Sequence, residues 1–113
     1  MTDKSKKDNA VYIEHMLDSI LRIDEYVKSK EHFYASNLVQ DAVVRNLQVM
    51  AESSQRLSDE IKNNYPDIPW NDISGFRNVL VHDYLGIDLD VIWSVVELEL
   101  PRLEKVLNEI NLK

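Results

Sequence analysis

Apolar residues recur along most of the chain at alternating steps of three and four, which is the spacing of one face of an α-helix. This pattern predicts a first helix over residues 8–30 and a second, longer helix over residues 37–64. Residues 31–36 between them should form a break or a tight corner, where Phe33 and Tyr34 fill the core. The two apolar stripes consist of Ile13, Met16, Ile20, Ile23 and Val27 in the first helix, and of Val39, Val43, Leu47, Met50, Leu57 and Ile61 in the second.

Proline and glycine delimit the next element. Pro66 and Pro69 forbid a continuous helix, so residues 63–70 are predicted to be a linker. A third helix is expected over residues 70–85, because Gly86 follows where a helix C-terminus would lie.

Several residues should determine how this third helix packs. Trp70 is large and is expected to wedge between helices. Gly75 would allow another helix to approach closely. Val79, Leu80 and Val81 are expected to anchor the end of the helix in the core.

A fourth helix is predicted after Gly86, with Asp88 as its N-cap. Its apolar residues repeat at four–three spacing, which suits packing against helices of the same chain or across a dimer. The sequence leaves both possibilities open. Pro101 lies inside this helix and should kink or briefly break it. The repeat consists of Leu89, Trp93, Val96, Leu100, Leu103, Leu107 and Ile110.

The composition supports an all-α fold, an up-and-down bundle of four to five helices in a single domain over residues 1–113. Glycine (2) and proline (3) are rare, and the absence of cysteine excludes disulfides and thiolate metal sites. No stretch resembles a signal peptide or a membrane span, so we expect a cytoplasmic protein without a membrane partner. The net charge of −7 opposes non-specific binding to nucleic acid.

One stretch, residues 76–84, concentrates the chemistry-bearing side chains in an otherwise apolar helical run. On an ideal helix, Arg77 and Tyr84 share a face within roughly 20°, whereas Arg77 and His82 lie roughly 140° apart. Asn78 and His82 are four residues apart and stack on one face. A histidine exchanges protons near neutral pH, and an arginine fits a phosphate, so the combination suits phosphodiester cleavage. Taken alone, however, one histidine near a helix end is more often structural.

The second predicted helix carries Arg45 and Glu52, which are seven residues apart and share a face. They could form a surface ion pair, which would contribute little to stability. Alternatively, this face could support the site around His82. The residues by themselves do not choose between these two interpretations.

The order of several segments along the chain reveals a family resemblance. The chain resembles the HepT-like proteins, the toxin members of the HEPN superfamily of helical domains, over nearly its whole length. One departure is Ala51, where the family often has glycine, and it bears only on how closely the helices pack. The segments that carry the resemblance are Asp41-Ala42-Val43-Val44-Arg45-Asn46-Leu47 with Ala51-Glu52, Tyr65-Pro66-Asp67-Ile68-Pro69-Trp70, Arg77 to Tyr84 as R-x-x-x-x-H-x-Y, Ile92-Trp93 and Leu100-Pro101.

The resemblance implies an RNase toxin that uses no metal and no cofactor. Arg77 and His82 would be the catalytic pair, and Asn78 would help to position His82 or the RNA. In the implied reaction a 2′-hydroxyl attacks the neighbouring phosphate and leaves a cyclic phosphate. Asp83, Arg45 and Glu52 would support the site.

The resemblance also implies partners. The family usually forms homodimers in which the two motifs meet at a cleft between the subunits. The antitoxin is typically a minimal nucleotidyltransferase, which transfers AMP from ATP to the tyrosine of the motif, here Tyr84. The added bulk and negative charge would block RNA phosphates from the cleft.

Two other interpretations remain open at the level of sequence. The chain could be a non-catalytic helical partner, or a substrate-binding subunit, of a nucleotidyltransferase. It could also be a plain helical dimer in which His82 and Tyr84 are buried hydrogen-bonding groups.

Overall fold

The computed structural model describes residues 3–82, 86 and 88–110, and for residues 3–7 and 82 it describes the backbone alone. Within these ranges the chain forms seven α-helices and one π-helical segment, and it contains no β-strand, which confirms the all-α prediction. The elements are α1 (Asp3–Tyr26), α2 (Lys30–Ala35), α3 (Asn37–Gln55), α4 (Asp59–Asn64), α5 (Trp70–His82), α6 (Leu89–Ser94), the π-helical segment η2 (Val95–Glu99) and α7 (Leu100–Glu109).

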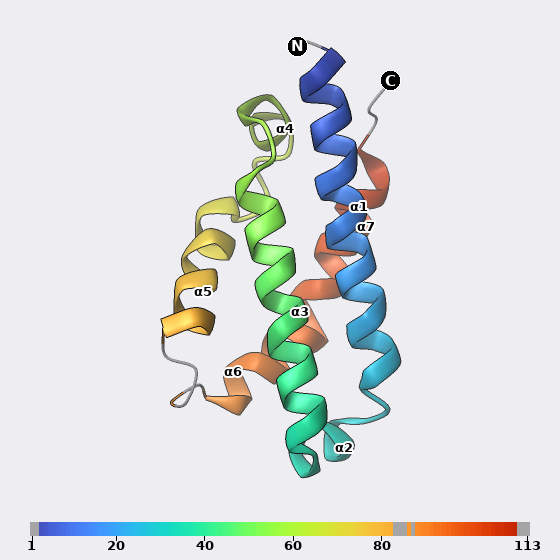
Figure 1. Cartoon of the computed structure of the whole chain (residues 1–113), viewed down its shortest axis with the longest axis vertical. Helices are drawn as coiled ribbons and strands as arrows, with labels where there is room; N and C mark the ends of the chain where they lie inside the picture. The colour runs from blue at the N-terminus through green and yellow to red at the C-terminus, as the bar shows by residue number, and fades with distance from the viewer. Residues whose placement is uncertain (1–2, 83–85, 87, 111–113) are drawn as a thin grey trace.

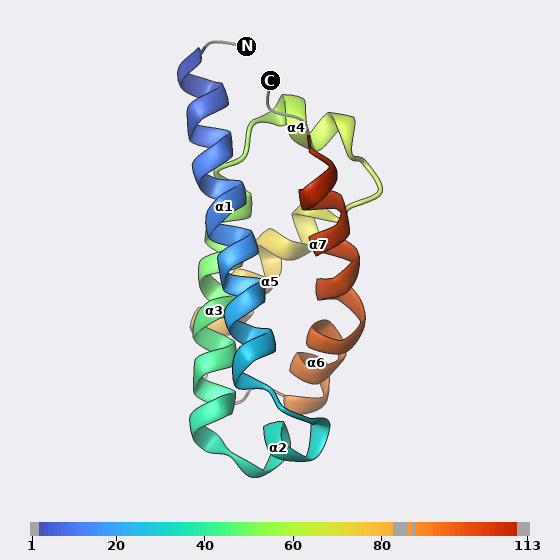
Figure 2. The same ribbon diagram turned by 90° about the vertical axis from the view of Figure 1, so that its right-hand side faces the viewer.

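The long elements run alternately up and down the bundle (Figure 1). Helices α1 and α3 lie antiparallel and make the most extensive contact, and α5 packs on the other side of α3. The last segment, from α6 through η2 to α7, returns along one side of the α1–α3 pair (Figure 2). The short helices α2 and α4 close opposite ends of the bundle. Helix α3 is thus central, because it contacts both α1 and α5.

The predicted apolar stripes form the core. Each long element contributes side chains that are almost completely buried, and the plug residue Phe33 of α2 is 0% exposed, as expected from the sequence. The apolar repeat predicted for the fourth helix packs against other helices of the same chain, so it forms part of the core of the monomer. The deeply buried apolar side chains include Met16, Ile20 and Ile23 of α1, Val43 and Leu47 of α3, Leu80 of α5, Ile92 of α6 and Leu100 of α7.

The first helix lies earlier than its predicted range of 8–30. Helix α1 spans Asp3–Tyr26, and the corner at 31–36 is itself the helix α2. The side-chain hydroxyl of Ser29 accepts a hydrogen bond from the backbone N–H of His32 at 3.0 Å, which makes Ser29 the N-cap of α2. A serine in this role has a non-helical backbone, and this explains why α1 cannot continue to residue 30.

The prediction of one helix over residues 37–64 is wrong, because α3 ends at Gln55 and α4 begins at Asp59. Ser58 caps α4, and it exchanges two hydrogen bonds with Asn9 of α1. The Asn9 amide donates to Ser58 Oγ, and the backbone N–H of Ser58 donates to Asn9 Oδ1, each at 3.0 Å. Asn9 is only 1% exposed. A partner 49 residues away therefore stabilises the break, and helical periodicity alone does not reveal such a contact.

Pro101 interrupts the last helix as predicted. The interruption takes the form of the π-helical segment η2, at whose end the backbone N–H of Leu100 donates to the carbonyl of Val95. Proline has no N–H to donate, and its ring excludes the carbonyl four residues earlier. A wider turn just before Pro101 accommodates both restrictions. Asp88 caps α6 through a bond from the N–H of Asp90, also as predicted.

The linker before α5 is fixed by Trp70. The Trp70 side chain is buried, and its indole N–H donates to the carbonyl of Tyr65 at 3.0 Å, which fits the predicted wedge. The expected close approach at Gly75 is wrong, since a Cβ added there would meet no atom within 4 Å. None of the helices in the described ranges has the length and apolar character needed to cross a lipid bilayer.

Candidate functional site

Helix α5 carries Arg77 and His82 on one continuous stretch of helix that runs from Trp70 to His82. The predicted end of this helix at residue 85 falls outside the described residues, as do Asp83 and Tyr84. The roles expected for those two residues and for the His82 side chain therefore stay predictions. Asn78 and Val79, which lie one turn before position 82, are both exposed.

Among the described side chains near the end of α5, Leu80 is the one that is buried in the core. Leu80 is 0% exposed, whereas Val79 is 42% and Val81 is 38% exposed. The expectation that all three residues enter the core is wrong for both valines. Successive residues turn by about 100° around a helix, so the neighbours of a fully buried residue point to its flanks. Val79 and Val81 are thus exposed on opposite flanks of Leu80, and Val81, four residues after Arg77, lies on the same side of α5 as Arg77.

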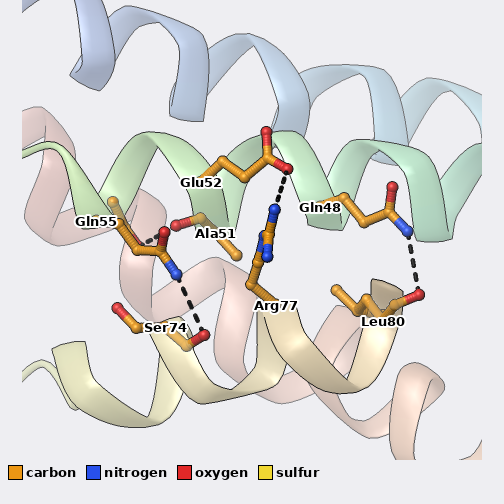
Figure 3. Close-up of polar contacts among 8 residues, drawn as sticks. Gln48, Ala51, Glu52, Gln55, Ser74, Arg77 and Leu80 are labelled. Atoms are coloured by element: carbon orange, nitrogen blue, oxygen red, sulfur yellow. Dashed lines mark hydrogen bonds and ion pairs between the residues drawn. The ribbon is translucent and has the colours of Figure 1, made fainter. Parts of the chain in front are cut away.

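The guanidinium of Arg77 points toward α3 and meets Glu52 (Figure 3). Arg77 Nη2 lies 3.4 Å from Glu52 Oε1, and the two side chains are 32% and 44% exposed. Arg77 Nε is buried and has no hydrogen-bond partner among the described residues. The ion pair of Glu52 thus joins α3 to the predicted catalytic arginine, and it is not formed with Arg45.

Two further residues of α3 bind the backbone of α5, and sequence reasoning missed both. Gln48 Nε2 donates to the carbonyl of Leu80 at 3.1 Å, and Gln55 Nε2 donates to the carbonyl of Ser74 at 3.3 Å. Figure 3 shows both side chains on the face of α3 that carries Glu52. Positions 48, 52 and 55 follow a spacing of four and three. This polar stripe is the signal in the sequence from which the contact could have been predicted.

The other predicted site residues lie at different places. Asn78 is exposed on α5. Arg45 is exposed on α3, two turns before Glu52, where it lines a hollow of about 400 Å³ together with His15 and Arg22 of α1. The supporting role proposed for Arg45 stays a prediction.

The nearby groove does not include Arg77, and the described side chains form no cluster of metal ligands. A groove of about 430 Å³ lies between α5 and the last segment of the chain, and its lining includes Phe76 and Leu103 but not Arg77. Among the described side chains, no three His, Cys, Asp or Glu residues lie together as metal ligands would.

The family profile of the ribonucleases that resemble HepT matches residues 16–110, a range that contains α3, α5 and the whole R-x-x-x-x-H-x-Y motif. The chain belongs to the ribonuclease HepT-like family.

Three curated relatives of this HepT-like chain illustrate the family. A "Gamma-glutamylcyclotransferase and putative RNase" of Methanocaldococcus jannaschii is 36% identical over 94% of this chain, which spans only 50% of that protein. A "Putative RNase" of Caldanaerobacter subterraneus is 35% identical over 88% of this chain and 90% of its own length. A "Probable ribonuclease HepT" of Thermococcus cleftensis is 31% identical over 88% of this chain and 92% of its own length. No solved structure matches.

The described part of this HepT-like site offers a cation for a phosphate. Arg77 presents a partly exposed guanidinium next to a carboxylate, which shares its charge and holds its orientation. Five residues later the helix carries a histidine, the side-chain type that most often transfers protons in catalysis. Charge stabilisation and proton transfer are the two requirements of metal-free cleavage of a phosphodiester.

Proposed function

We propose that the protein is an endoribonuclease toxin that cleaves RNA without a metal ion, with Arg77 and His82 as its catalytic pair. The observation that carries this proposal is the family match over residues 16–110, which includes the full R-x-x-x-x-H-x-Y motif. The position of Arg77 supports it, because the guanidinium is partly exposed and lies on the same helix as His82.

The proposed reaction needs no co-reactant. A 2′-hydroxyl of the RNA loses its proton to a base while its oxygen attacks the adjacent phosphorus. The bond from phosphorus to the 5′-oxygen breaks, and that oxygen takes up a proton. The products are a 2′,3′-cyclic phosphate and a 5′-hydroxyl. In this scheme His82 transfers protons, and Arg77 stabilises the charge that develops on the phosphate oxygens. Asn78 positions His82 or the RNA.

We propose that the active unit is a homodimer. Within one α5, the directions of residues 77 and 82 differ by about 140°, and Arg77 is drawn toward Glu52 on α3. A single phosphate is therefore reached more easily by the arginine of one subunit and the histidine of the other. Val81 is exposed, lies four residues after Arg77 on the same side of α5, and supplies apolar surface that a second copy would cover.

We propose further that a minimal nucleotidyltransferase neutralises the toxin at Tyr84. The phenol oxygen would attack the α-phosphorus of ATP, pyrophosphate would leave, and the phenol proton would be released. The transferred AMP adds a phosphate to a motif whose function is to bind one. It would compete with RNA for the guanidinium of Arg77.

The first test is cleavage of RNA by the purified protein in the presence of EDTA. The wild type should produce ends with cyclic phosphates, and Arg77→Ala and His82→Ala should lose this activity. Arg102→Ala and His32→Ala are matched controls that should retain it. If the wild type does not cleave RNA under any condition, the chain is a non-catalytic partner of the nucleotidyltransferase instead.

A mixing experiment tests whether the site is shared between subunits. Arg77→Ala and His82→Ala are each expected to be inactive. When the two variants are unfolded, mixed and refolded together, a mixed dimer regains one site with both groups intact if the pair is formed across the interface. Recovery of part of the activity supports the shared site, and no recovery from verified mixed dimers contradicts it.

The intact mass of the protein tests the switch. Co-expression with the proposed minimal nucleotidyltransferase should add one or more adenylate units and abolish RNA cleavage. Tyr84→Phe should prevent both effects, whereas Tyr65→Phe, the matched control, should prevent neither. Modification that persists in Tyr84→Phe would rule out Tyr84 as the acceptor.

A further inference from the structure

The last turn of α5 is held by a side chain of another helix. Gln48 Nε2 on α3 donates to the carbonyl of Leu80 at 3.1 Å, two residues before His82. Leu80 also has a fully buried side chain. Both its side chain and its backbone are therefore fixed.

Helix α3 uses a glutamine in the same way at a second helix end. Gln40 Nε2 donates to the carbonyls of Phe33 and Tyr34 at 3.0 and 3.1 Å, in the last turn of α2. Glutamines of α3 thus bind backbone carbonyls near the C-terminal ends of α2 and α5. In both cases the donor comes from a part of the chain that is already fixed by the core.

Hydrogen bonds also fix the chain just after the motif, at residues 88 and 90. The hydroxyl of Tyr34 in α2 is hydrogen-bonded to Asp90, and Asp88 caps the start of α6. The motif is therefore flanked by one anchored turn at the end of α5 and another at the start of α6. Only the first of these contacts falls within the motif itself.

We propose that Gln48 is a positioning residue, which holds the last described turn of α5 so that position 82 keeps its place in the catalytic site. This inference rests on the proposed function, because the placement matters only if His82 acts on the same phosphate as an Arg77. A shift of about 1 Å in a catalytic group can reduce a rate on the order of 100-fold. Loss of a single hydrogen bond to this turn can therefore lower the rate of catalysis.

Gln55 provides a matched control. It donates from the same face of α3 to the same helix, but its acceptor is the carbonyl of Ser74, which lies near the start of α5. Gln48→Met and Gln55→Met each remove one amide donor and keep a long, helix-favouring side chain. If the bonds serve only to hold α3 and α5 together, the two variants should behave alike.

The first readout is kinetic. Gln48→Met should lower kcat on the order of ten-fold or more and change KM little, as expected when only placement in the transition state is lost. Gln55→Met should leave kcat unchanged. Gln48→Lys restores an N–H donor and should recover most of the activity. Equal kcat values for Gln48→Met and wild type, or an equal loss in both Met variants, would overturn the proposal.

The second readout does not depend on catalysis. The ring signals of the three histidines can be resolved by NMR and assigned from His→Ala variants. In Gln48→Met the His82 signal should shift or split, while those of His15 and His32 stay in place, and Gln55→Met should change none of them. An unchanged His82 signal in a folded Gln48→Met protein would contradict the proposal.

The two readouts separate the possible failures. A wild type that does not cleave RNA refutes the proposed function, and the NMR comparison still decides whether Gln48 positions the turn. If Gln48→Met does not fold, Gln48→Glu replaces it, because it has the same shape and presents an acceptor instead of a donor to the carbonyl. It carries the same expectations.

Discussion

Arg77 of α5 and Glu52 of α3 form an ion pair between two helices, with 3.4 Å between Nη2 and Oε1. The pair is partly open to solvent, so it contributes at most about 1 kcal/mol to stability. The ion pair matters for the orientation of the Arg77 side chain. The carboxylate draws the guanidinium toward α3, and Arg77 Nε is buried there. In the proposed function, Glu52 would therefore determine which part of Arg77 faces a phosphate of the RNA.

Removal of this carboxylate should affect activity more than stability. We expect Glu52→Ala to lower kcat for RNA cleavage on the order of ten-fold, since the guanidinium loses its fixed orientation. The free energy of unfolding should fall by no more than about 1 kcal/mol. Cleavage assays and urea denaturation of the same preparations measure the two effects.

Glu52→Gln distinguishes orientation from charge. The amide oxygen of glutamine still accepts a hydrogen bond from Arg77, so this variant should keep most of the activity if orientation dominates. Glu104→Ala serves as the control for loss of one carboxylate elsewhere. Wild-type kinetics in Glu52→Ala would show that the ion pair has no part in catalysis.

Leu80 and Val79 are neighbours on α5 with opposite environments, at 0% and 42% exposure. Leu80→Ala should reduce the free energy of unfolding by about 2–5 kcal/mol, because it removes buried methyl groups and leaves a cavity. Val79→Ala should change it by only about 0.5 kcal/mol in the monomer. Urea denaturation at low protein concentration compares the two, and similar losses would contradict the described packing of α5.

Asn9 should stabilise the fold from a distance in sequence. Asn9→Ala removes both hydrogen bonds to Ser58 and leaves the partly buried backbone N–H of Ser58 without this acceptor, so we expect a loss of about 1–3 kcal/mol in the free energy of unfolding. Asn63→Ala, at an exposed position in α4, is the matched control and should have little effect. Equal stabilities of the two variants would show that the link between α1 and α4 is dispensable.

Tyr34 should make stability depend on pH in the alkaline range. The hydrogen bond to Asp90 raises the pKa of the Tyr34 hydroxyl to about 12, compared with about 10 in an unfolded chain. A raised pKa in the folded state means that the stabilisation is complete below about pH 10 and is lost as the pH rises toward 12.

This dependence can be isolated with Tyr34→Phe. The difference in unfolding free energy between wild type and Tyr34→Phe should stay constant up to about pH 10 and shrink above it. Absorbance of the phenolate in the folded protein gives an independent measurement, in which Asp90→Asn should let Tyr34 ionise at lower pH. A difference that does not change between pH 9 and 11 would argue against the contact with Asp90.

Periodicity predicted the helices well where one face of a helix meets one core. The stripes of α1, α3 and the last segment were all readable from the sequence, and Pro101 marked where the last helix is interrupted. The prediction failed at residues 56–58, because the break there is stabilised by Asn9 of α1. It also failed at Val79 and Val81, which are apolar but exposed. Local pattern does not show how wide the buried face of a helix is.

Some residues of the candidate site could be predicted from the sequence, and others could not. Arg77, Asn78, His82 and Tyr84 were recognisable as a motif from residue types and spacing, since one short stretch carries all of them. Gln48 was missed because a glutamine on a helix surface is ordinary by itself. Its role becomes visible only when α5 lies against α3 and the Leu80 carbonyl comes within reach.

The sequence by itself determined the all-α class, the apolar stripes and the family, because these depend on residue type and on spacing along one chain. The tertiary structure alone decided that Glu52 meets Arg77, that Gln48 binds the carbonyl of Leu80 and that Asn9 meets Ser58 at the break in the second predicted helix. Each of these is a hydrogen bond or ion pair between helices. Such a contact requires atoms to lie within about 3.5 Å of one another, and only the packing of the core brings residues 25 to 49 positions apart to that distance.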